Sequence, residues 1–143
     1  MEPSTPSSDH SRQAAEVLPA GECLRLLASV QAGRIIYTRK ALPAVELVNF
    51  AMDAGDIVIL TDAGNALAVA TQHTVVAFEA DEFDAVSGRG WSVTVVGLSR
   101  EVTDPQDIGR LREKGLHSWP AGGGDHFIRI TPGIVNAQRL AYR

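Results

Sequence analysis

The sequence predicts a mainly β protein, folded as an antiparallel β-barrel of about six to seven strands with a few short helices. Two observations predict this class. Short runs of β-branched and aromatic residues recur from residue 34 to the end of the chain, and turn residues typical of hairpins separate most of them. A sheet of so many apolar strands in 143 residues would expose its edges, and closure into a barrel removes them.

The chain begins with a polar segment that is followed by a helix. Residues 1–17 are rich in Ser and Pro, so we expect a disordered N-terminal tail. We expect residues 18–143 to form a single domain. Pro19 suits the first turn of a helix over 19–29, whose apolar residues fall on one face.

The first half of the domain is predicted to hold three strands. These are residues 34–38, 44–52 and 57–61. Along the second run, alternate residues point to opposite faces, so Asn49 lies on the face opposite Val48. The turn at 53–56 contains Gly55, which adopts a positive φ without strain, and it predicts a hairpin. The third run is continuously apolar, which predicts a strand buried on both faces.

The second half mixes strands with two short helices. The expected strands are 74–80, 91–102, 126–131 and 134–140, and the expected helices are 66–71 and 105–114. Asp104 and Pro105 suit the cap and first turn of the second helix. We expect a polar loop over 81–90 and a turn at Pro132-Gly133. Gly97, inside the longest strand, predicts a bulge or the close approach of another backbone.

Composition excludes several classes of function. The net charge of −4, the absence of a Lys/Arg run and an aromatic content of 6% argue against nucleic acid as a partner. Cys23 is the single cysteine and lies in an apolar stretch, so we expect a buried thiol and neither an internal disulfide nor a zinc site. No secretory signal and no apolar run of about 20 residues is present, so we expect a cytoplasmic protein without a membrane span.

An ordered series of short motifs runs through the domain from Pro19 to Leu140. The motifs are Glu22-Cys23-Leu24-Arg25-Leu26-Leu27-Ala28 with Gly33-Arg34, Pro43-Ala44-Val45 with Val48-Asn49-Phe50, Thr61-Asp62-Ala63-Gly64, Phe78-Glu79-Ala80-Asp81, and Gly90-Trp91-Ser92-Val93 with Gly97. This series resembles the pyridoxamine-phosphate-oxidase-like, FMN-binding split-barrel family of flavin-nucleotide-binding proteins. The resemblance implies a split β-barrel and a homodimer with two FMN sites at the subunit interface.

The resemblance also implies a set of cofactor-binding residues. They are Arg34, Val48, Asn49, Thr61, Gly64, Asn65, Arg89 and Trp91. Val48 and Asn49 would flank the flavin ring, and Trp91 would face the site from the other chain. Thr61, Gly64 and Asn65 would lie near the flavin phosphate. Many family members carry a lysine where this chain has Ala66, and Arg34 or Arg89 of the other chain would then supply the cation.

Each of these residues also has a structural interpretation, and the sequence leaves both open. Thr61 is an ordinary strand former, Trp91 also suits the core, and Arg34 and Arg89 also suit a solvated surface. The amide of Asn49 needs partners if it is buried, and those partners are either a ring edge or backbone groups.

Two classes of function remain open. The first is an FMN- or F420-dependent oxidoreductase acting on a small molecule, in which the cofactor performs the redox step and few side chains need be catalytic. The second is a non-catalytic dimeric barrel that has lost tight FMN binding and holds F420, another ligand or none. Ala66 favours the second class, and cofactor titration separates the two.

Overall fold

The computed structural model describes residues 15–119 and 124–141, with side chains from Leu18 onward. Six antiparallel strands close into a barrel, in the order β7-β4-β3-β2-β5-β6, and β6 pairs back onto β7. The strands are β2 (Ala32–Arg39), β3 (Leu42–Asp53), β4 (Asp56–Thr61), β5 (Thr74–Asp84), β6 (Arg89–Glu101) and β7 (His126–Ala141). A short strand, β1 (Ala15–Val17), adds to β7. The predicted fold class, a mainly β antiparallel barrel of six to seven strands, is confirmed.

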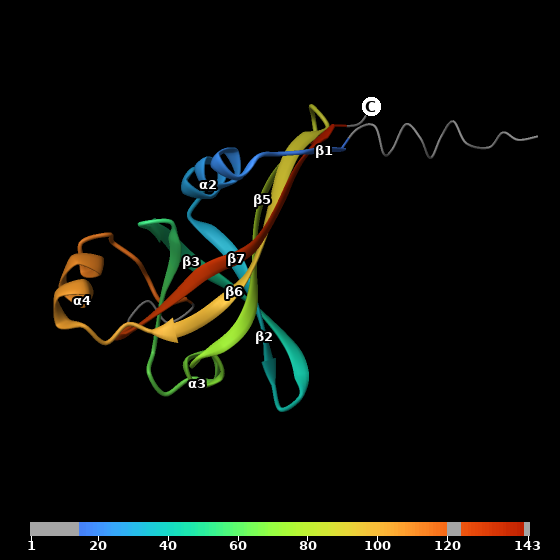
Figure 1. Ribbon diagram of the computed structural model, residues 1–143. Helices are drawn as coiled ribbons and strands as arrows, with labels where there is room; N and C mark the ends of the chain where they lie inside the picture. The colour runs from blue at the N-terminus through green and yellow to red at the C-terminus, as the bar shows by residue number, and fades with distance from the viewer. Residues whose placement is uncertain (1–14, 120–123, 142–143) are drawn as a thin grey trace, which may run out of the picture.

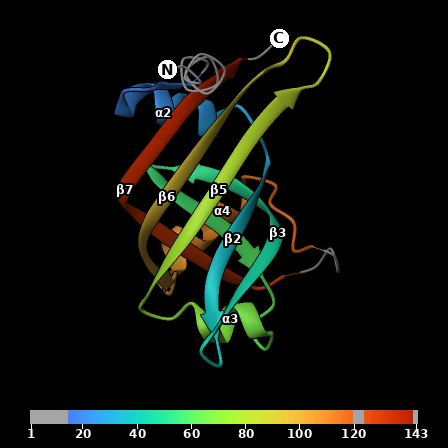
Figure 2. The ribbon, with the colours of Figure 1, turned by 90° about the vertical axis from the view of Figure 1, so that its right-hand side faces the viewer.

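Three short helices accompany the barrel in the part of the chain that is described. Helix α2 (Ala20–Ala28) covers one end and buries Cys23 and Leu27 in the barrel core (Figure 1). Helix α3 (Ala66–Ala70) lies at the opposite end, which we call the base, beside the β2–β3 hairpin (Figure 2). Helix α4 (Pro105–Arg112) packs outside the barrel. The Asp104 side chain caps α4 as predicted, accepting from the Gln106 N–H at 2.9 Å.

The core divides along β4. Ile57 and Ile59 point into the barrel, where the large side chains include Phe50 and Phe78, whose ring centroids lie 4.8 Å apart. Val58 points outward into a smaller cluster beneath α4. The predicted burial of this strand on both faces is therefore confirmed, because α4 covers the face that the barrel interior does not.

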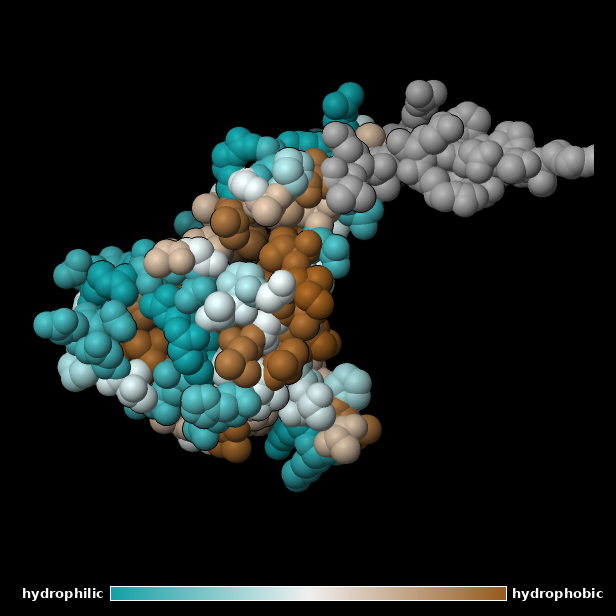
Figure 3. Space-filling model, viewed as in Figure 1, coloured by the Kyte–Doolittle hydropathy of each residue, from teal (hydrophilic) through white to brown (hydrophobic). Residues whose placement is uncertain are grey.

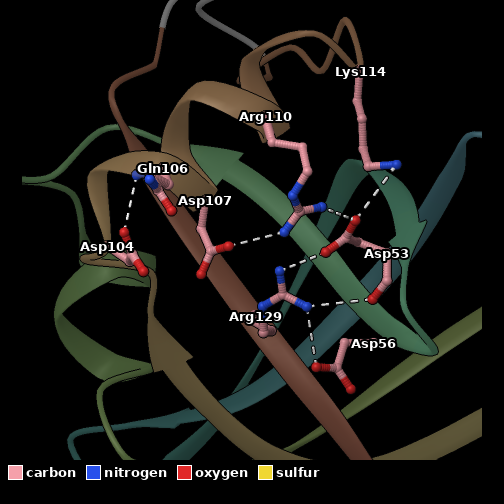
Figure 4. A network of polar contacts seen from close by, with 8 residues as sticks. All are labelled: Asp53, Asp56, Asp104, Gln106, Asp107, Arg110, Lys114 and Arg129. Atoms are coloured by element: carbon pink, nitrogen blue, oxygen red, sulfur yellow. Dashed lines mark hydrogen bonds and ion pairs between the residues drawn. The ribbon is translucent and has the colours of Figure 1, made fainter.

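A network of charges fastens α4 to the barrel (Figure 4). The buried carboxylate of Asp53 accepts from Arg129 on β7 at 2.6 Å and from Arg110 on α4, and it lies 3.7 Å from the Lys114 ammonium. Arg129 also contacts Asp56 at 3.1 Å. The network thus joins the β3–β4 hairpin, β7 and α4 through one side chain.

The predicted polar loop over 81–90 is mostly strand. The ladder between β5 and β6 continues through Asp81–Ser92 to Asp84–Arg89, and only residues 85–88 form the turn. The polar side chains on this stretch misled the prediction, because its backbone pairs although few of its side chains are buried. The extended hairpin, residues 81–92, and the end of β7, residues 138–141, project beyond α2, and we call them the arm (Figure 1).

The predicted turn at Pro132-Gly133 is wrong, because β7 runs through it. Val96 pairs with Ile134 and Gly97 with Pro132, so Gly133 is the extra residue of a β-bulge. A Cβ on Gly97 would lie 2.0 Å from the Thr131 carbonyl oxygen. The close approach predicted at Gly97 is confirmed, and the bulge lets β7 accommodate Pro132 without ending.

Other boundaries also differ from the prediction. Residues 15–17, which we expected in the tail, pair with residues 138–140 at the edge of β7, an acceptor that exists only in the folded chain. The rest of that expected tail and most of the expected glycine loop, residues 122 and 123, lie outside the described residues. Helix α4 ends at Arg112, two residues before the predicted end. None of the described helices is long and apolar enough to cross a membrane.

Candidate functional site

Thr61 and Asn65, two of the predicted phosphate-site residues, lie together at the base. Thr61 ends β4 and is buried, and the Asn65 amide donates to its hydroxyl oxygen at 2.6 Å. The side-chain oxygen of Asn65 caps α3 by accepting from the Ala68 N–H at 2.9 Å. Both polar atoms of the Asn65 side chain are therefore used within the chain.

The loop between Thr61 and Asn65 has an acidic character. The Ala63 N–H donates to the Asp125 carboxylate at 3.1 Å, and the Asp125 N–H donates to the Thr61 carbonyl at 3.1 Å. Asp62 adds a second carboxylate, and residues 61–66 contain no lysine or arginine. Gly64 leaves open space in which a ligand can approach the backbone. The loop offers access but fits an anionic phosphate only if a cation comes from elsewhere.

His126 lies beside this loop, and sequence reasoning assigned it no role. It pairs with Thr61 across β4 and β7, so both side chains lie on the interior face of the sheet. Its Nδ1 is 3.4 Å from the Glu101 carboxylate, and its buried Nε2 has no partner among the described residues. The interior alternation of β7 was the only sequence feature that indicated its burial.

The side chains of Asn49 and Val48 make their contacts within the chain. The Asn49 amide donates to the Gln31 carbonyl at 2.9 Å, and its oxygen accepts from the His117 N–H at 2.8 Å. The structural interpretation of Asn49, with backbone groups as its partners, matches this geometry. Val48 points into the core and is 5% exposed, so only its backbone is available to a flavin ring.

Arg34 is occupied by two carboxylates. Its Nη1 lies 3.0 Å from Glu79 and 3.1 Å from Asp81 on the outside of the barrel. Burial and the neighbouring Asp81 raise the pKa of Glu79 to about 7, despite the opposing charge of Arg34. The three side chains carry a net negative charge when both carboxyls are ionised, so Arg34 does not present a free cation to a phosphate.

Arg89 and Trp91 line an open pocket on the arm. The pocket has a volume of about 740 Å³, within the usual range for small-molecule sites. Its lining residues are Glu82, Phe83, Asp84, Ser87, Arg89, Gly90, Trp91, Arg139, Leu140 and Ala141. Trp91 is largely buried and also packs in the barrel core, so its two interpretations coexist. The exposed Arg89 guanidinium makes no ion pair with any described residue.

The predicted site residues therefore fall into separate groups. Thr61, Gly64 and Asn65 lie at the base, whereas Arg89 and Trp91 lie on the arm at the other end of the molecule (Figure 2). One chain does not bring these groups together. The base residues could approach the arm residues only if the arm belonged to a second copy of the chain.

Comparisons with known proteins agree with this architecture. Residues 19–139 match the family model described as pyridoxamine 5'-phosphate oxidase. The chain is 38% identical over 139 residues to the uncharacterized protein Rv0080 of Mycobacterium tuberculosis, covering 94% of this chain and 90% of that protein.

Two solved structures share the fold over nearly their whole length. An FAD-binding protein from Mycobacterium smegmatis is 32% identical, with a TM-score of 0.76, covering 88% of this chain and 98% of that one. A putative pyridoxamine 5'-phosphate oxidase from Corynebacterium glutamicum is 28% identical, with a TM-score of 0.77, covering 91% of this chain and 96% of that one. The matched span, the closed six-stranded barrel and these relatives together place the chain in the pyridoxamine 5'-phosphate oxidase-like family.

Proposed function

We propose that this protein binds a flavin nucleotide at the interface of a homodimer and serves as a flavin-dependent oxidoreductase of the cytoplasm. The observation that carries the proposal is the 32% identity, over 88% of this chain, to a protein described as FAD-binding. FMN is the cofactor that the sequence resemblance implies, and FMN and FAD share the ring, the ribityl chain and its phosphate.

The separation of the predicted site residues supports the dimer. The base offers an accessible loop without a cation, and the arm offers an aromatic wall and a free arginine. If the arm of one copy lies against the base of the other, Arg89 supplies the cation that Ala66 does not, and Trp91 covers one side of the ring. A flavin in this position would perform hydride or electron transfer, while the chain binds and orients it.

A second candidate is favoured by the acidic loop. Asp62 and Asp125 would repel a phosphate, and no residue between 61 and 66 offsets them. In this alternative the protein is a non-catalytic dimer that binds flavin weakly or takes F420 instead. Titration with FMN, FAD and F420 distinguishes the two, since the main proposal expects saturable binding of FMN or FAD.

Arg89→Gln tests the assignment of the phosphate ligand. Loss of one charge-assisted hydrogen bond should raise the dissociation constant for FMN by roughly tenfold or more. Riboflavin, which lacks the phosphate, should bind the variant and the native protein equally. Flavin fluorescence during titration gives both constants.

Arg112→Gln is the matched control, because Arg112 is an exposed arginine on α4 rather than on the arm. The affinity of the Arg112→Gln variant for FMN should equal that of the native protein. Saturable FMN binding that Arg89→Gln leaves unchanged would refute the role of Arg89. Failure of FMN and FAD to bind at all would refute the proposed function itself.

A further inference from the structure

The outside of the barrel carries an apolar surface that no part of the described chain covers. Figure 2 looks onto it, with β7, β6, β5, β2 and β3 side by side. Strand register places Val45, Ile36, Ala77, Val96 and Ile134 in one row across these strands. Val75 and Leu98 pair in the next row toward the base. We call these outward-pointing residues the outer face.

The exposure of these side chains is unusual for a solvated sheet. Val45 is 61% exposed, Val75 64%, Leu98 44% and Ile134 59%. Figure 3 shows apolar side chains gathered along the edge of the barrel where β2 and β5 run. A contiguous apolar surface of this kind on a small protein marks an interaction site.

The outer face is acidic on the side of the arm. Glu79 pairs with Arg34 and Thr94 in the row that adjoins the apolar rows, and Asp81 follows toward the arm. Arg34 contacts both carboxylates, which leaves one negative charge in excess when both are ionised. Through these residues, β2 and β5 present charge to a partner that binds the outer face.

The outer face is basic on the side of the base. Arg100 lies beyond Leu98 on β6, and its guanidinium donates to the Thr131 hydroxyl at 2.8 Å without a carboxylate partner among the described residues. Lys40, in the turn that follows β2, lies toward the same end of the barrel. Thr94, the neighbour of Glu79, precedes Arg100 by six residues on β6, which is about 20 Å along the strand. The exposed apolar rows lie between the two charged ends.

This arrangement is self-complementary for one orientation of two copies. Consider a two-fold axis that lies in the plane of contact and runs perpendicular to the strands. It places the apolar rows of one copy against those of the other, and the acidic end of each copy against the basic end of its partner. The same orientation sets the arm of each copy toward the base of the other, as the proposed flavin site requires. A parallel arrangement would instead bring the two acidic ends together.

We propose that two copies pack antiparallel through the outer face, that Glu79 and Asp81 of one copy pair with Arg100 of the other, and that this contact makes assembly depend on pH and salt. The inference rests on the proposed function, because it takes a second copy of the chain as the occupant of the face.

The direction of the pH dependence follows from the groups that face Glu79. They are Arg34 on β2, Asp81 on β5, Thr94 on β6, Leu47 on β3 and Asn136 on β7. Arg34 is the only cation among them, and the pKa of Glu79 is about 7 in the single chain. Arg100 of the second copy would lower that pKa on assembly. The dimer then binds fewer protons than two separate chains, so association strengthens as the pH rises through about 7.

Sedimentation velocity over a concentration series tests the inference on the full chain. The dimer dissociation constant should fall roughly tenfold from about pH 6 to about pH 8, and it should rise with added salt at the higher pH. Glu79→Gln preserves the shape of the side chain and should remove most of the pH dependence. Its folded state is checked by circular dichroism.

Exchange of the two charges tests the pairing itself. Arg100→Glu and Glu79→Arg should each weaken the dimer about tenfold, and the double variant should recover most of the loss. Arg112→Glu makes the same charge change on α4 and should leave the dissociation constant unchanged.

The possible results separate the inference from the proposed function. The charge pairing is overturned by any of three results: a dimer dissociation constant that does not change with pH and salt, one that falls at acid pH, or one that does not recover in the double variant. Each of these results leaves an interfacial flavin site intact. A chain that stays monomeric under every condition overturns both. Flavin binding measured on the same samples shows whether the proposed function stands without the pairing.

Discussion

Asp53 is the side chain on which the attachment of α4 depends. Asp53→Asn would leave the buried guanidinium of Arg129 with Asp56 as its remaining carboxylate. Breaking a buried ion pair by removing one partner should lower the free energy of unfolding by about 3 kcal/mol. Urea unfolding measures the change. Asp107→Asn is the control, because Asp107 is half-exposed and its ion pair within the described chain is with Arg110, so its loss should cost much less.

The same side chain should make the fold sensitive to acid. Burial opposes ionisation of Asp53, but the hydrogen bonds and charges of Arg129 and Arg110 outweigh it and hold its pKa below the ordinary value of 3.8. A carboxyl whose pKa is lower in the folded state stabilises the fold above its unfolded pKa and loses that contribution as the pH falls through its folded pKa. Stability of the native protein should therefore decline below about pH 4 more steeply than stability of Asp53→Asn.

At this scale the sequence identified unusual residues but not their partners. Asn49 stood out as an amide in an apolar strand, and its partners proved to be Gln31 and the backbone of His117, 18 and 68 residues away. Arg34 likewise meets Glu79 and Asp81 on another strand. Contacts of that range depend on how segments distant in the sequence come together in the fold, which the residue types alone do not specify.

Among the elements, β6 and β7 form the longest pairing, from Arg89–Ala141 to Glu101–Ile128. Gly97→Ala would drive a Cβ into the Thr131 carbonyl at the bulge, where only backbone can yield. We expect a loss of about 2 kcal/mol or more in the free energy of unfolding. Gly109→Ala is the matched control, because a Cβ there meets nothing within 4 Å inside α4 and should stabilise the protein by about 0.5–1 kcal/mol. Equal effects of the two substitutions would contradict the close approach.

The elements whose ends are set locally were predicted well. Gly55 defines the β3–β4 hairpin, and Asp104 with Pro105 defines the start of α4. Two errors of the prediction share a physical origin. The polar stretch 81–90 and the Pro132-Gly133 pair both resemble turns in isolation, yet pairing with neighbouring strands keeps their backbone extended.

For the whole molecule, closure of the barrel could be predicted because a short chain with many apolar strands has few other ways to cover its edges. The candidate site could not be located in the same way. Its residues lie at the base and on the arm, and a sequence contains no information on how two such ends meet across copies. The proposal that they meet across copies rests instead on the apolar outer face with its acidic and basic ends.

Sedimentation velocity of the protein mixed with FMN or FAD, recorded together at a protein wavelength and at a flavin wavelength, tests the central claim most directly. A flavin-binding dimer predicts that flavin co-sediments with a species of twice the chain mass, at one flavin per chain. Flavin that sediments only as the free ligand, or that travels with a single chain, would contradict an interfacial flavin site.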